Sequence, residues 1–67
     1  MSAQSLYARL GVWEVWVGKF QFDGWDCFLR RRGVHGDERV PGGPFLSRAT
    51  AGEAGIIYVR TKTNDLT

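Results

Sequence analysis

The sequence predicts a mostly β domain, a small antiparallel sheet or open barrel of four to five strands, with or without one short helix. Two apolar, β-rich runs within residues 13–32 flank Asp23-Gly24, a dipeptide typical of a tight hairpin turn. Residues 56–63 are β-branched nearly throughout, which favours a strand. Glycine and proline interrupt residues 33–44. The alternative is an α+β fold of order β-β-β-α-β.

The chain is short enough to form one small domain, residues 1–67, and we expect its ends, residues 1–10 and 64–67, to fray. A chain of this size buries only about 60% of the surface that it exposes when unfolded. The hydrophobic fraction of 43% supplies enough side chains for one core. The sequence shows no signal-peptide pattern and no apolar run long enough to cross a membrane. We therefore expect a cytoplasmic protein.

The first ten residues allow two predictions. Ser2 is a candidate cap for one or two helical turns, in which Leu6 and Leu10 are four residues apart. The competing prediction extends the first strand backwards through Tyr7.

The next segment, residues 11–22, changes its side-chain phase at Gly18. Before this glycine, the apolar residues on one face are Trp13, Val15 and Val17. After it, Phe20 and Phe22 have the other parity. A β-bulge at Gly18 would produce this shift, and a tight Gly18-Lys19 turn is the alternative.

The return strand, residues 25–32, alternates cleanly. One face carries the apolar side chains Trp25, Cys27 and Leu29. The other face carries Asp26, Phe28, Arg30 and Arg32. We predict that the apolar face is buried together with Ile57 and Val59. The single cysteine then acts as a small buried hydrophobe and not as a reactive thiol.

The second half of the chain is less regular. Residues 34–40 can hold a short edge strand, and residues 45–51 a strand or the start of a short helix capped by Ser47. We expect such a helix to end at Gly55, where the strand of residues 56–63 follows.

The sequence does not support catalysis. His35 lies in a glycine-rich loop, and Asp37 and Glu38 nearby do not complete a nucleophile–base arrangement. One cysteine and one histidine cannot form a structural zinc site, and the glycines match no phosphate-binding motif. We therefore predict no enzymatic activity, no metal and no cofactor.

Aromatic and arginine side chains are the candidate binding residues. The run Arg30-Arg31-Arg32 can contact phosphates, can dock on a protein, or can simply keep a strand end solvated. Trp16 and Phe28 lie opposite the predicted core face, where an uncovered aromatic patch would mark a partner site. The predicted partner-binding residues are Trp16, Phe28, Arg30, Arg31, Arg32, Arg39, Tyr58 and Arg60.

Two motifs carry a family resemblance. G-W-x-C-x-L-R-R-R-G over residues 24–33, followed by G-P-F-x-S-R-A over residues 43–49, resembles small β-meander proteins of phages and mobile elements, which include anti-CRISPR-like inhibitors. The pattern is also similar in outline to the arm-type DNA-binding domains of tyrosine recombinases. Those domains read DNA with a three-stranded sheet, and they carry a longer helix than the one expected here.

These observations lead to three functional expectations. The first is a phage-type, non-catalytic binding module that docks on and inhibits a host protein or nucleoprotein complex in the host cytoplasm. The second is a sheet that binds nucleic acid directly. The third is a self-associating subunit, such as a homodimer. We expect no membrane partner.

Overall fold

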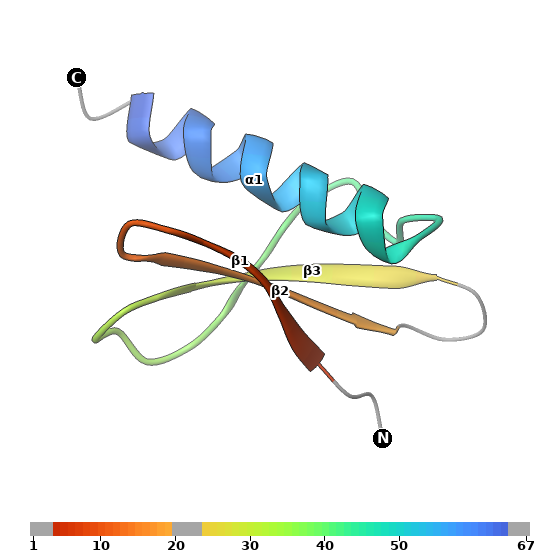
Figure 1. Cartoon of the computed structure of the whole chain (residues 1–67), viewed down its shortest axis with the longest axis horizontal. Coiled ribbons are helices and arrows are strands. Elements are labelled where there is room, and N and C mark those ends of the chain that lie inside the picture. Colours follow the sequence, from red (N-terminus) through yellow and green to blue (C-terminus); the bar gives the residue numbers. More distant parts are fainter. Residues whose placement is uncertain (1–3, 20–23, 65–67) are drawn as a thin grey trace.

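Four antiparallel strands form one sheet in the order β1-β2-β3-β4, and a single helix crosses one of its faces (Figure 1). The structure is a computed structural model, and it describes residues 4–19 and 24–64. The elements are β1 (Gln4–Leu10), β2 (Trp13–Lys19), β3 (Trp25–Arg31), β4 (Glu38–Arg39) and α1 (Arg48–Asn64). The expected mostly β class with one helix is confirmed, and the helix has 17 residues.

The N-terminal segment is a strand and not a helix. Residues 4–10 form a strand in which every residue except Tyr7 pairs with β2, so the helix predicted for this region is wrong. The candidate cap Ser2 lies outside the described residues. The chain reverses at Gly11 and Val12, where Gly11 adopts a φ of 64° that glycine tolerates without steric cost.

The β-bulge of this sheet lies in β1. The β1–β2 register shifts between Leu6 and Ala8, so Tyr7 is the inserted residue. Gly18 pairs with Asp26 in an unshifted ladder, so both the bulge and the tight turn predicted at Gly18 are wrong. The bulge lets both Tyr7 and Ala8 pack against the core.

The second and third strands form the central hairpin. Their pairing runs without interruption from Trp13 with Arg31 to Lys19 with Trp25, as the hairpin prediction requires. Gly24 belongs to neither strand, and Asp23 lies outside the described residues, as do Phe20 and Phe22.

The far edge of the sheet is short and irregular. Of the predicted edge strand in residues 34–40, only Glu38 and Arg39 form β4. The following segment covers the rest of the β3 edge. Val40 N donates to Cys27 O (2.9 Å), and Phe45 exchanges two backbone hydrogen bonds with Trp25 (2.7 and 2.9 Å).

The segment at residues 56–63 is helical, so its assignment as a strand is wrong. Ser47 starts the helix as predicted, because Thr50 N donates to its Oγ (3.1 Å) and Ala51 N to its carbonyl oxygen (3.0 Å). The helix passes through Gly55 without a break. The strand alternative for residues 45–51 is also wrong, because only Phe45 forms an isolated bridge there.

Helix geometry explains which side chains of this segment are buried. Ala51, Gly55 and Val59 recur at intervals of four, so they share one face of α1, and all three are buried. The predicted burial of Val59 is confirmed. The predicted burial of Ile57 is wrong, because Ile57 lies on another face of α1, where it is 62% exposed.

The core lies between α1 and the sheet. Its sheet side comprises Val15, Val17, Cys27 and Leu29, each at most 1% exposed. Trp13 and Trp25 pack at its margins. The predicted burial of Cys27 and Leu29 is confirmed, and burial raises the pKa of the Cys27 thiol to about 11.

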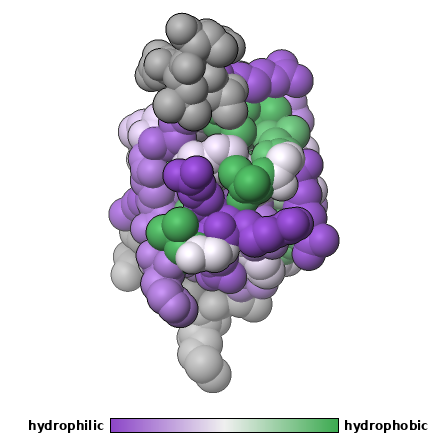
Figure 2. Space-filling model, turned by 90° about the vertical axis from the view of Figure 1, so that its left-hand side faces the viewer, coloured by the Kyte–Doolittle hydropathy of each residue, from purple (hydrophilic) through white to green (hydrophobic). Residues whose placement is uncertain are grey.

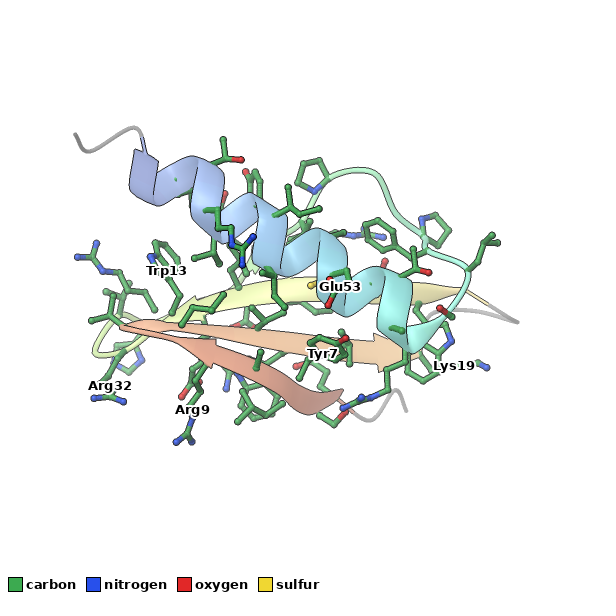
Figure 3. All side chains as sticks on the ribbon, turned by 45° about the horizontal axis from the view of Figure 1, so that its top comes forward. Tyr7, Arg9, Trp13, Lys19, Arg32 and Glu53 are labelled. Carbon is green, nitrogen blue, oxygen red and sulfur yellow. The ribbon has the colours of Figure 1, made fainter. Side chains whose placement is uncertain are left out.

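One contact ties the bulged strand to the start of the helix. The Tyr7 ring lies against Gly52, and its hydroxyl donates to Glu53 Oε2 (3.3 Å; Figure 3). Arg48 places its guanidinium 5.2 Å from the centre of the same ring and donates to Leu6 O (3.4 Å). The helix is therefore fixed across β1 as well as across the central hairpin.

Candidate partner-binding face

A row of large side chains crosses the sheet on the face away from α1. Leu6 pairs with Trp16, Trp16 with Phe28, and Phe28 with Arg39. Directly paired residues share a face, and this row alternates with the core residues of β2 and β3. Leu6, Trp16 and Phe28 are only partly buried. In Figure 1 no described helix covers this side of the sheet, which the loop before β4 reaches where Asp37 binds Arg30.

A second row on the same face carries charge. Arg9 pairs with Glu14, and Glu14 with Arg30. We call these seven residues the open face: Leu6, Arg9, Glu14, Trp16, Phe28, Arg30 and Arg39. Trp16 lies at its centre, with its Nε1 donating to Glu14 Oε1 (3.0 Å) and the Arg30 guanidinium 4.8 Å from its ring centre.

Every arginine of the open face meets a carboxylate. Arg30 donates to both oxygens of Asp37 (2.8 and 3.3 Å), and Arg39 donates to Asp26 Oδ1 (2.9 Å). The Arg9–Glu14 pair is longer, at 3.7 Å. Hydrogen bonding from Arg30 holds the pKa of Asp37 below its ordinary value. The face is therefore apolar at its centre and nearly balanced in charge at its rim.

The structure brings four of the predicted binding residues together and separates the others. Trp16, Phe28, Arg30 and Arg39 belong to the open face. The remaining four lie elsewhere: Arg31, Arg32, Tyr58 and Arg60.

The positions of these four residues in the fold explain why they lie outside the open face. Arg31 pairs with Trp13 and so lies on the helix side, and Arg32 lies in the turn after β3. Tyr58 is on α1 and donates to Glu38 Oε2 (2.8 Å), and Arg60 is exposed on the same helix. The last two were expected on a strand, and helix formation moves them away from the open face.

Sequence reasoning missed Leu6, Arg9 and Glu14 as parts of the face. Glu14 has the parity of Trp16, so its place could have been read from alternation. Leu6 and Arg9 could not, because the bulge at Tyr7 changes the parity of β1 between them.

Residues 4–19 and 24–64 hold few other groups that could take part in chemistry. No three His, Cys, Asp or Glu side chains lie close enough together there to hold a metal ion. His35 is exposed in the loop before β4. No helix in this part of the chain is long and apolar enough to cross a membrane.

Comparison with protein-family models, with curated proteins and with solved structures finds no match to this chain.

Proposed function

We propose that the protein is a non-catalytic binding module that docks on another protein through its open face. The observation that carries this proposal is the row Leu6–Trp16–Phe28 at the centre of the sheet, which is partly exposed and which no helix of the described residues covers. Exposed aromatic surface with arginine beside it is typical of protein-binding hot spots. The resemblance to small phage proteins adds a biological role, that of an accessory protein that binds and blocks a host protein.

The charges of the open face favour a protein over a nucleic acid. A surface that binds phosphates needs cations that are available to replace counterions. Here Arg9, Arg30 and Arg39 are each paired with a carboxylate of the same chain. Phosphates would have to compete with Glu14, Asp37 and Asp26 for these arginines, and the carboxylates would repel the backbone.

The test is capture from a host-cell lysate by the immobilised protein, followed by affinity measurement with the captured partner. We expect capture to survive nuclease treatment, and the affinity to fall far less between about 50 and 200 mM salt than the orders of magnitude expected for a phosphate-binding surface. Trp16→Ala should weaken binding by about 2 kcal/mol or more, because it removes the centre of the interface.

The matched control is Ile57→Ala, which removes an exposed apolar side chain from α1, outside the open face. It should leave the affinity unchanged. Equal losses from Trp16→Ala and Ile57→Ala, or loss of every captured protein on nuclease treatment, would contradict the proposal. Self-association would instead appear as a concentration-dependent mass in the purified protein without any partner.

Nucleic-acid binding by the sheet is the second candidate, and one observation favours it. The helix runs from Arg48 to Asn64, so it is longer than the sequence indicated. A long helix behind an open antiparallel sheet is the outline of the arm-type domains that the motifs resemble. This candidate predicts a steep fall of affinity for plain DNA with salt and a small effect of Trp16→Ala.

A further inference from the structure

The open face by itself is small for a stable complex. Seven residues of a strand span about 24 Å and four strands about 19 Å, so the flat outline of the sheet is about 450 Å². A standard interface buries about 800 Å² of accessible surface on each partner. A protein that docks on the open face therefore gains contact area by reaching a neighbouring surface.

The end of the sheet at the β1–β2 turn is such a neighbour. Arg32 N donates to Val12 O (2.8 Å), and Val34 N donates to Arg31 O (3.1 Å), so the two turns at this end form one surface. We call it the basic end: Val12, Arg31, Arg32 and Val34. Figure 3 shows Arg32 and Arg9 on the side of the sheet away from α1, so Arg32 connects the basic end to the open face, whereas Arg31 lies on the helix side beside Trp13.

Apolar and cationic groups are both exposed at the basic end. Val12 is 47% exposed and Val34 is 54% exposed. Figure 2 looks at this end of the molecule and shows apolar residues set among hydrophilic ones. A partner that covers the end therefore gains apolar contact as well as charge.

The two arginines at this end differ from those of the open face. In the part of the chain that the structure describes, neither Arg31 nor Arg32 forms an ion pair. The Arg31 guanidinium lies 5.9 Å from the centre of the Trp13 ring, which also has Lys62 Nζ at 5.7 Å. The Trp13 ring thus lies near two cationic groups, and Lys62 also pairs with Glu38 (3.0 Å).

We propose that the basic end receives acidic side chains of the protein that docks on the open face, an inference that rests on the proposed function. Carboxylates fit Arg31 and Arg32 by charge, and apolar neighbours of those carboxylates fit Val12 and Val34. A nucleic acid fits less well, because two unpaired arginines release few counterions and a phosphate backbone offers the valines no apolar contact.

The test uses three labelled probes and fluorescence anisotropy. The probes are a peptide that alternates glutamate with leucine, its glutamine–leucine analogue, and oligo(dT). We expect the wild-type protein to bind the glutamate peptide about tenfold more tightly than the glutamine peptide, and oligo(dT) more weakly than the glutamate peptide.

The variants locate this preference. The double variant Arg31→Glu/Arg32→Glu should lose the preference for glutamate. Lys19→Glu is the matched control, because Lys19 also stacks on a tryptophan (5.2 Å from the Trp25 ring centre) but lies at the other end of the sheet. It should keep the preference. Circular dichroism checks that each variant is folded.

Each other outcome has a defined meaning. Absence of binding or of a glutamate preference overturns the proposal, and so does a preference that survives the double variant or disappears equally in Lys19→Glu. Tighter binding of oligo(dT) overturns it in favour of nucleic acid. The variant Trp16→Ala tests the proposed function independently, because it should weaken the binding of both peptides equally. If Trp16→Ala changes neither peptide, the open face fails as a docking site while the basic end stands.

Discussion

Gly55 of α1 lies directly over Cys27 of β3. A Cβ atom added at Gly55 would lie 2.5 Å from the Cys27 sulfur and 2.6 Å from Val15 Cγ1, both too close for real side chains. One turn earlier, a Cβ at Gly52 would overlap the Tyr7 ring. The helix therefore approaches the sheet along two glycines, closer than any other residue would permit at those positions.

This approach predicts that Gly55→Ala destabilises the fold, although alanine is the better helix former. Alanine gains about 1 kcal/mol in helix propensity, whereas overpacking a core costs about 1–3 kcal/mol. We expect a net loss in the free energy of unfolding, measured by urea denaturation. A stabilised Gly55→Ala protein would show that the helix can move away from the sheet at little cost.

A double-mutant cycle identifies the cause of that loss. Cys27→Ala removes the sulfur that the new methyl group would meet. Combined with Gly55→Ala, it should give a loss smaller than the sum of the two single losses, with a coupling of about 1 kcal/mol. Additive losses would place the strain elsewhere.

Burial of Cys27 predicts how stability depends on pH in alkaline solution. The folded thiol has a pKa of about 11, above its ordinary value of 9.0, mainly because burial disfavours the thiolate. Between these values the folded protein holds a proton that the unfolded chain releases, so stability falls as the pH rises from about 9 to 11. Cys27→Ala should fall less steeply over this range in parallel urea titrations. Identical slopes would contradict the assignment.

The helix cap predicts a separate loss. Ser47→Ala removes the acceptor for Thr50 N, and its hydroxyl also lies 2.9 Å from Thr50 Oγ1. We expect a loss of about 1 kcal/mol in the free energy of unfolding. Ser47→Asp retains an acceptor at the same position and should restore most of it. Failure of Ser47→Asp to recover stability would mean that the cap contributes little.

The two apolar residues of α1 on different faces predict opposite outcomes. Val59 is 3% exposed and Ile57 is 62% exposed. Val59→Ala should cost about 2 kcal/mol, and Ile57→Ala should stay within about 0.5 kcal/mol of wild type. Thermal or urea unfolding measures both. Similar costs at the two positions would indicate a strand, in which residues two apart share a face.

The sequence predicts the central hairpin well because alternation is a local signal. Strands β2 and β3 show a period of two over seven residues each, and their core residues Val15, Val17, Cys27 and Leu29 were all identified. The strand prediction for residues 56–63 is wrong because β-branched side chains favour strands only weakly. The helix there depends on the Ser47 cap and on packing of Ala51, Gly55 and Val59, a spacing of four that was present in the sequence but was outweighed by propensity.

The sequence places a candidate binding residue on the correct face only where it also predicts the correct strand. Trp16, Phe28 and Arg30 follow from alternation in the hairpin. Arg39 joins them through pairing with Phe28, a contact between distant segments that no local pattern encodes. Tyr58 does not join them, because its segment, predicted as a strand, is part of the helix.

The start of β1 and the end of α1 lie at opposite ends of the sheet. β1 begins at Gln4, paired with Gly18 next to Lys19, whereas Lys62 near the end of α1 has its Nζ 5.7 Å from the centre of the Trp13 ring. In Figure 1 the start of β1 and the end of α1 lie on opposite sides of the molecule. An affinity tag or surface linkage attached beyond α1 therefore crowds the basic end, and one attached before β1 leaves that end accessible. Immobilising the protein in the two orientations should give different apparent affinities for a partner, and the difference would itself report which end the partner covers.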